Sequence, residues 1–165
     1  PDAQLLLVGH QLHGSMNGTE EYHARLEALI AELNIGHRCV FLGNRNDVEQ
    51  IYPACDVTAL SSLYEGTPNV LLESMACGVP VVATDVSDNA YVARDGETGF
   101  LVQLGNEEAM ADRLYTLLSD DKLRRDMGRK AHDWVTSEFS LQQLARNTEA
   151  VYLEALSRRR NDSIA

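Results

Sequence analysis

Residues 65–80 read EGTPNVLLESMACGVP; an apolar run, residues 56–62, precedes this stretch, and a second one, residues 79–83, continues it. Short apolar runs of this kind are typical of buried strands, whereas the stretch between them has apolar residues at helical spacing. The order predicts a strand, a loop, a helix and a second strand.

The helix in this stretch has recognisable signals at both ends. Pro68 suits the first turn of a helix, where its missing N–H is not needed, and Thr67 is a candidate cap. Gly78 can adopt the left-handed conformation that ends many helices, and Pro80 does not continue one. We therefore expect a helix over residues 68–77.

Two carboxylates flank the start of this helix. Glu65 lies in the loop at the carboxyl end of the first strand, and Glu73 lies eight positions later, within the helix. Gly66 lets a ligand approach the backbone, and the free N–H groups of a helix start attract phosphate, with a dipole contribution of about 0.3–1 kcal/mol. Carboxylates in turn accept hydrogen bonds from hydroxyl groups. The combination indicates a ligand such as a nucleotide sugar; the alternative is that both acids are simply solvated.

The rest of the chain repeats the alternation of strands and helices. Apolar runs predict five strands, at residues 4–8, 39–42, 57–60, 79–84 and 99–102. Apolar residues at helical spacing predict helices at 19–33, 46–54, 68–77, 89–93, 106–118 and 121–136, and a last helix capped by Ser140. We expect an α/β fold with a Rossmann-like, doubly wound parallel sheet of about five strands and C-terminal helices. Residues 1–157 form one domain in this interpretation, and residues 158–165 form a frayed tail.

Composition restricts the classes of partner. The formal net charge of −11 argues against nucleic acid and against an anionic membrane surface. No apolar run approaches the ~20 residues of a membrane span. Cys39, Cys55 and Cys77 lack metal-ligand spacing and are expected to be free thiols in a reducing compartment. His10 and His13 are only a weak metal-like pair, so we predict no metal site.

The sequence resembles a known family in the opening stretch and on both sides of it. Glu65 and Glu73 are separated by seven residues, and SMACGVPVVATD follows at residues 74–85. Further matching blocks are LLLVG at 5–9, VFLG at 40–43, DV at 47–48, IY at 51–52, CDV at 55–57 and DGETGFLV at 95–102. Nearly the whole chain is similar to the C-terminal, nucleotide-sugar-binding domain of retaining glycosyltransferases of the glycosyltransferase 4 family, which is one half of the GT-B architecture.

The resemblance implies a role for each part of the site. Glu73 is expected to accept hydrogen bonds from the ribose hydroxyls and Glu65 to contact and position the sugar, so both are assigned as catalytic. The backbone N–H groups of residues 66–70 are expected to bind the distal phosphate and the sugar, with no metal and no other cofactor. The implied donor-binding residues are Gly9, His10, Gly43, Asn44, Arg45, Gly66, Thr67, Pro68, Asn69, Val70 and Glu73.

Some of these assignments have a plain alternative. In the family the turn at residues 43–45 lies beside the nucleobase, whereas Arg45 is equally well a surface cation. Gly9 and His10 follow the first strand at its carboxyl end, where open α/β sheets bind ligands. His10 either faces the diphosphate or the sugar, or is a solvated loop residue.

The chain also departs from the family. Members commonly carry glycines and a glutamate after the fourth strand, where this chain has VSDNAY at residues 86–91, so Tyr91 cannot take the role of that acid. The family's first strand and helix, with an Arg and a Lys for the donor diphosphate, have no counterpart here, and neither does the N-terminal acceptor domain. We hypothesise that the sheet closes imperfectly, pairs differently, or is completed by another chain through self-association.

The leading hypothesis is the donor-binding domain of an enzyme that transfers a sugar, with retention, from a nucleoside-diphosphate sugar to an acceptor. The resemblance implies a cytoplasmic hexosyltransferase of carbohydrate biosynthesis. The isolated domain is expected to be inactive, and the missing domain is expected to be the part that contacts the inner face of the membrane. The alternatives are a non-catalytic nucleotide-sugar-binding or scaffold module, and a sugar-nucleotide epimerase of the same architecture. Neither the nucleotide, the sugar nor the acceptor is specified by the sequence.

Overall fold

The computed structural model describes residues 2–9 and 19–162 of the 165-residue chain. The chain divides into two compact units, Pro1–Ile51 and Tyr52–Ala165. We expected residues 1–157 to form one domain, whereas these residues are divided between the two units.

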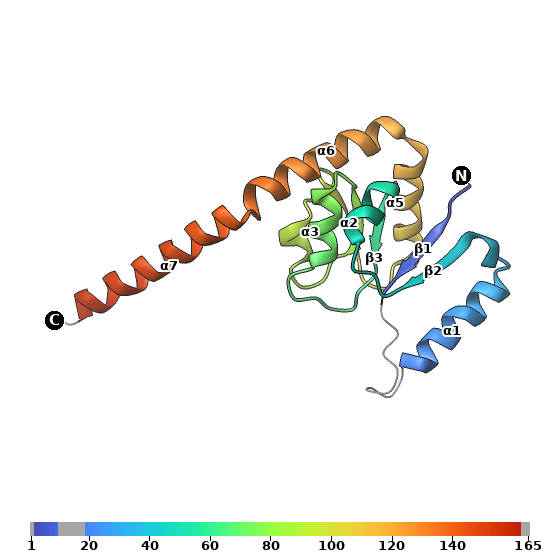
Figure 1. Ribbon diagram of the computed structural model, residues 1–165, viewed down its shortest axis with the longest axis horizontal. Helices are drawn as coiled ribbons and strands as arrows, with labels where there is room; N and C mark the ends of the chain where they lie inside the picture. Colours follow the sequence, from blue (N-terminus) through green and yellow to red (C-terminus); the bar gives the residue numbers. More distant parts are fainter. Residues whose placement is uncertain (1, 10–18, 163–165) are drawn as a thin grey trace. The chain divides into compact units, whose positions relative to one another are not determined.

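The first unit contains two parallel strands and the helix between them in sequence (Figure 1). β1 (Leu5–Val8) pairs with β2 (Cys39–Gly43), with Leu5 opposite Cys39. Parallel strands need a crossover connection, and α1 (Thr19–Glu32) belongs to it. The remaining elements are the 3₁₀ helix η1 (Gly36–Arg38) and α2 (Val48–Ile51).

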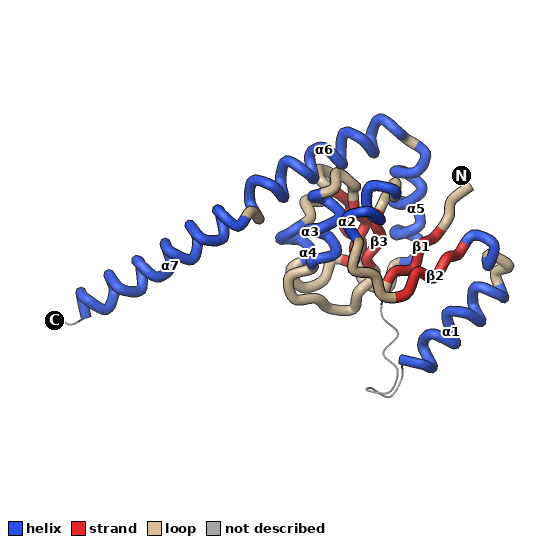
Figure 2. The backbone as a smooth tube through the Cα atoms, in the orientation of Figure 1, coloured by secondary structure: helices blue, strands red, loops and turns tan. Residues whose placement is uncertain are grey.

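The second unit contains a three-stranded parallel sheet in the order β3–β4–β5. Figure 2 draws the strands red and labels β3. Its elements are η2 (Tyr52–Ala54), β3 (Thr58–Leu60), α3 (Asn69–Ala76), β4 (Val81–Thr84), α4 (Asn89–Val92), β5 (Gly99–Val102), α5 (Glu107–Ser119), α6 (Asp121–Glu138) and α7 (Leu141–Asp162). Ser140 caps α7 as predicted, because its Oγ accepts a 3.2 Å hydrogen bond from the N–H of Gln143. All five predicted strands are present, with ends within two residues of those expected.

Helices cover both faces of this sheet, so its central strand, β4, is buried on both sides. Val81 and Ala83 pack in a cluster with residues of α3, α4 and α6. Val82 packs in a second cluster with Leu117 of α5 and Met127 of α6. Since successive residues of a strand point to opposite faces, the two clusters lie on opposite sides of β4. The α/β, doubly wound character that we expected is confirmed in this unit.

Close packing fixes α3 against α6 and β3. A Cβ atom at Gly128 of α6 would overlap the carbonyl oxygen of Gly78, so this approach requires a glycine. Gly78 has φ +76°, the left-handed conformation predicted for the end of α3. On the sheet side, the buried Ser74 hydroxyl donates a 2.8 Å hydrogen bond to Thr58 Oγ1. The helix that carries the candidate site is therefore anchored on two sides.

The strand pairing differs from the single sheet of about five strands that we expected. The described strands pair in two sets, β1–β2 and β3–β4–β5. The three hypotheses for the sheet, namely imperfect closure, different pairing and completion by another chain, stay predictions.

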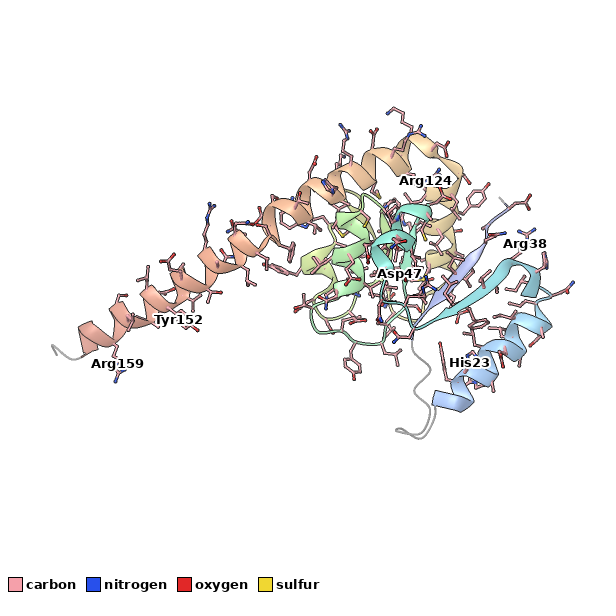
Figure 3. The ribbon with its side chains drawn as sticks, viewed as in Figure 1. His23, Arg38, Asp47, Arg124, Tyr152 and Arg159 are labelled. Atoms are coloured by element: carbon pink, nitrogen blue, oxygen red, sulfur yellow. The ribbon has the colours of Figure 1, made fainter. Side chains whose placement is uncertain are left out.

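The C-terminal end also differs from expectation. α7 continues to Asp162, so residues 158–162 are helical where we expected a frayed tail; residues 163–165 lie outside the described ranges. An i,i+4 ion pair of 2.5 Å between Arg158 and Glu154 supports these last turns. Tyr152 is 67% exposed, and its side chain projects from α7 in Figure 3. Further apolar residues exposed along α7 are Leu141, Leu144, Val151, Leu153 and Leu156.

Several single-residue expectations are met. Trp134 and Phe139 pack against the core, and the Trp134 Nε1–H donates a 2.9 Å hydrogen bond to the carbonyl of Val92. Cys39, Cys55 and Cys77, all within the described ranges, are partly buried and not joined in disulfide bonds. Among the described helices, none combines the length and the apolar character that a membrane crossing requires.

Candidate functional site

The first carboxylate of the predicted site is held by the loop that carries it. Glu65 is partly buried and follows β3, at the carboxyl end of the sheet. Its Oε1 accepts a 2.5 Å hydrogen bond from Ser62 Oγ. The carbonyl of Ser62 in turn accepts a 2.7 Å hydrogen bond from Thr84 Oγ1, at the end of β4. The ends of two neighbouring strands therefore fix the position of Glu65.

The amino end of α3 is open to ligands. The backbone N–H groups of Gly66, Thr67, Asn69 and Val70 have no hydrogen-bond acceptor within the described part of the chain, and all four residues are exposed. Unpaired N–H groups at a helix start carry partial positive charge. This end can therefore bind an anion through the backbone, without a cationic side chain.

The helix start itself differs from the prediction in one respect. Pro68, expected within the first turn, occupies the N-cap position, and its carbonyl accepts a 3.0 Å hydrogen bond from the N–H of Leu71. No side chain caps the helix, so the prediction that Thr67 is the cap was wrong. Pro68 is fully buried, which anchors this turn while its neighbours face solvent.

The second carboxylate lies on the exposed side of α3. Glu73 is exposed, and its Oε2 accepts a 3.2 Å hydrogen bond from the hydroxyl of Tyr52 in η2. Burial, and then the charge and hydrogen bond of Glu73, raise the pKa of Tyr52. The phenol is therefore neutral at physiological pH, and its proton is available to the Glu73 carboxylate.

The predicted site residues of the first unit form a separate group. The N–H of Gly9 donates a 2.9 Å hydrogen bond to the carbonyl of Gly43, which has φ +65°. Asn44 is exposed. His10 and its predicted metal-like partner His13 lie outside the described residues. A backbone hydrogen bond thus joins two of the predicted site residues, Gly9 and Gly43.

Arg45 is paired rather than free. Its Nε and Nη2 donate hydrogen bonds of 2.8 and 2.6 Å to the two carboxylate oxygens of Asp47, which is labelled in Figure 3. This bidentate contact lowers the pKa of Asp47. A guanidinium has five N–H groups, so three remain for a ligand.

Sequence reasoning missed the residues that orient the two acids. Tyr52 lies 21 positions before Glu73, and Ser87, whose Oγ accepts a hydrogen bond from the N–H of Glu65, lies 22 positions after Glu65. Single hydroxyl groups at such separations leave no periodic signal. Tyr91 instead packs edge-to-face on Phe139, with ring centroids 5.6 Å apart.

Other features of the surface do not compete with this site. Two open hollows, lined by residues 103–108 and by residues of α5, include none of the predicted site residues. Within residues 2–9 and 19–162, no group of three His, Cys, Asp or Glu side chains is arranged to hold a metal ion. The polar groups around the start of α3 are therefore what defines the candidate site.

Residues 1–134 match the protein family described as "Glycosyl transferases group 1", and the chain belongs to this family. Its relatives include N-acetyl-alpha-D-glucosaminyl L-malate synthase of Bacillus anthracis, 34% identical over 163 residues, which are 99% of this chain and 40% of the relative. The fold matches the crystal structure of Anabaena Alr3699/HepE in complex with UDP, with a TM-score of 0.81 and 28% identity, over 91% of this chain and 42% of that one. It also matches sucrose-phosphate synthase from Thermosynechococcus elongatus, with a TM-score of 0.83 and 30% identity, over 94% of this chain and 39% of that one. The chain thus spans about 40% of the length of these proteins, and its Rossmann-like fold is that of GT-B glycosyltransferases.

Proposed function

We propose that this chain is the donor-binding domain of a retaining glycosyltransferase that transfers a hexose from a nucleoside-diphosphate sugar to an acceptor. The observation that carries the proposal is the amino end of α3, where four backbone N–H groups lack an acceptor among the described residues. In the sequence these groups lie between Glu65 and Glu73. Family membership supports sugar transfer in general. The retaining mechanism and the donor-binding role rest on the resemblance of residues 65–85 to retaining glycosyltransferases.

The chemistry of the site is divided between its parts. Glu73 accepts hydrogen bonds from the ribose hydroxyls, and its bond with Tyr52 limits the directions in which it can do so. Glu65 contacts the sugar and positions it. The N–H groups of residues 66–70 bind the distal phosphate and stabilise the charge that develops on the leaving diphosphate, without a metal. No protein general base is assigned, because the leaving diphosphate itself can accept the proton of the acceptor.

Backbone N–H groups suit this particular chain. With a formal net charge of −11, this chain as a whole repels a nucleoside diphosphate. A helix start concentrates positive potential locally, which offsets part of that repulsion. The start of α3 is therefore the phosphate-binding element of the second unit, and hydroxyl groups of the ligand are left for the acids.

The first unit supplies the nucleobase contacts in this proposal. Gly43, with its left-handed backbone, and Asn44 present main-chain and amide groups at the carboxyl end of β2. Arg45 reaches the base with the N–H groups that Asp47 leaves unused. By the family resemblance, Gly9 and His10 are assigned to the diphosphate or the sugar.

The acceptor site is assigned to the part of the enzyme beyond this chain, since the chain spans 40% of its relative from Bacillus anthracis. We propose that an N-terminal domain there binds the acceptor, and that the enzyme is cytoplasmic. The domain described here is then inactive alone but binds the donor.

Two measurements on the full-length protein test the proposal. Isothermal titration with UDP, GDP and ADP should give saturable binding of at least one nucleotide; UDP comes first because it is bound in Anabaena Alr3699/HepE. Proton NMR of the product should show the anomeric configuration of the donor sugar. Binding without transfer indicates a scaffold module, conversion of the free nucleotide sugar indicates an epimerase, and no binding of any of the three nucleotides rejects the donor site.

A further inference from the structure

Ser87 has a backbone conformation that serine rarely adopts. Its φ is +48°, in the left-handed region, three residues after the end of β4. Apart from glycines, the described residues include one other positive φ, at Asn34, and asparagine tolerates this region better. Strained residues persist where the surrounding structure fixes them, and they concentrate at functional sites.

Buried anchors hold the turn around Ser87. The carbonyl of Thr84 accepts hydrogen bonds from Asn89 Nδ2, at 2.8 Å, and from the N–H of Val86, at 3.0 Å. The N–H of Asn89 donates a 3.1 Å hydrogen bond to the carbonyl of Val86. Thr84 is 4% exposed and Asn89 is fully buried, so water competes little for these bonds. The exposed Ser87 therefore takes its conformation from the turn.

The hydroxyl of Ser87 contacts the loop that carries Glu65. The N–H of Glu65 donates a 3.1 Å hydrogen bond to Ser87 Oγ. The residues before Glu65 give the loop little other support, because Leu63 is 75% exposed and Tyr64 is 82% exposed. Gly66, which follows, has no side chain. Ser87 is thus a hydrogen-bond acceptor for the backbone of Glu65 at a point where the loop is otherwise poorly packed.

The same turn also reaches the carboxylate of Glu65. Thr84, at the start of the turn, donates from Oγ1 to the carbonyl of Ser62, at 2.7 Å. Ser62 then donates from Oγ to Glu65 Oε1, at 2.5 Å. One rigid turn after β4 therefore holds Glu65 twice, at its backbone directly and at its side chain through Ser62.

We propose that Ser87 is a positioning residue for sugar transfer: its hydroxyl sets the position of the Glu65 backbone, and with it the part of the site that meets the donor sugar. This inference rests on the proposed function, in which Glu65 contacts the sugar. Glycine would adopt the left-handed φ without strain but would leave the Glu65 N–H without its acceptor. Substitutions at Ser87 can therefore separate the effect of the backbone strain from the effect of the hydroxyl group.

The variants Ser87→Gly and Ser87→Ala in the full-length enzyme make this separation. Both remove the hydroxyl, but only glycine relieves the backbone strain. We expect both to lower kcat for sugar transfer about tenfold, because a displaced loop misorients the sugar. The Kd for the free nucleoside diphosphate should stay unchanged. The unfolding temperature should fall in Ser87→Ala and should hold or rise in Ser87→Gly.

A purely structural role predicts a different pattern, in which kcat follows stability. Loss of transfer in the stable Ser87→Gly variant supports positioning, whereas unchanged kcat in this variant overturns it. A second readout needs no activity: amide hydrogen exchange at Glu65 should become about tenfold faster in both variants. Asn34→Gly relieves the other positive φ and should leave exchange at Glu65 unchanged. If neither Ser87 variant changes this exchange, the inference is overturned.

Glu65→Gln separates failure of this inference from failure of the proposed function. If Glu65→Gln lowers kcat while Ser87→Gly does not, Ser87 is not a positioning residue and the proposed function stands. If Glu65→Gln leaves kcat unchanged, Glu65 does not serve the sugar, and both proposals fall.

Discussion

The hydroxyl of Tyr52 donates a 3.2 Å hydrogen bond to Glu73 Oε2, joining η2 to the second turn of α3. Glu73 is exposed, so without this contact its carboxylate would sample several rotamers. Fixing a long side chain before the ligand arrives reduces the entropy that binding must remove. Tyr52 is therefore part of the site even though it is assigned no contact with the donor.

Tyr52→Phe should weaken nucleotide binding without unfolding the protein. The change removes one hydrogen bond and keeps the ring, and a bond of this kind contributes about 0.5–1.5 kcal/mol. We expect the Kd for the nucleoside diphosphate to rise roughly 2- to 12-fold, measured by isothermal titration on the full-length protein. Tyr115→Phe, on the exposed surface of α5, is the matched control and should bind normally. Equal affinities of the Tyr52 variant and the control would contradict the positioning of Glu73 by Tyr52.

The same hydroxyl predicts a dependence of stability on pH in the alkaline range. Burial and Glu73 raise the pKa of Tyr52 above its ordinary value of 10.0, so folding favours the neutral phenol. The resulting stabilisation is fully present below pH 10.0 and is lost as the pH rises through the folded-state pKa. Urea unfolding between about pH 7 and 11 should show the wild type losing stability relative to Tyr52→Phe above about pH 10. The other tyrosines titrate in both proteins, so a constant difference across this range would refute the shift.

Gly128→Ala tests the packing that holds α3. The added Cβ would overlap the carbonyl oxygen of Gly78, and backbone atoms cannot rotate away as a side chain does. We expect a loss of about 1–3 kcal/mol in the free energy of unfolding, measured by urea denaturation. In Gly36→Ala the new Cβ meets only Ile30 Cγ2, at 3.8 Å, so this control should be close to neutral. A neutral Gly128→Ala would mean that α3 and α6 can separate without cost.

The strands and helix ends were predictable because their causes are local. β4 is a short apolar run that is buried along its whole length, and Gly78 and Ser140 act on the backbone within three residues of themselves. Thr67 failed as a cap because the buried Pro68 takes the N-cap position instead. The C-terminal tail was predicted to fray because it is basic and then polar, whereas α7 extends to Asp162.

The polar contacts of the site could not be predicted in the same way. Glu65 and Glu73 were predicted as site residues because each flanks or lies in a helix whose start is visible in the sequence, and because this stretch resembles the family's. Their partners Tyr52 and Ser87 come from elements more than 20 positions away, and only the folded sheet brings them near. The pairing of the described strands in two sets, β1–β2 and β3–β4–β5, was not predicted either, because apolar runs give no information about which strands become neighbours.

Glu73→Gln and Glu65→Gln should have different effects in the full-length enzyme, because the two acids serve different parts of the donor. Glu73→Gln weakens charged hydrogen bonds to the ribose, each worth about 1.5–3 kcal/mol, so the Kd of UDP and of the nucleotide sugar should rise together by about 10- to 100-fold. Glu65→Gln should leave the Kd of UDP unchanged, since UDP lacks the transferred hexose that Glu65 is proposed to contact, and should lower kcat by about 100-fold. Glu149→Gln, on exposed α7, controls for the loss of one negative charge. If both site variants weaken UDP binding equally, or if neither changes binding or kcat, the two acids do not divide the donor between them, and the assignment of roles at the start of α3 fails.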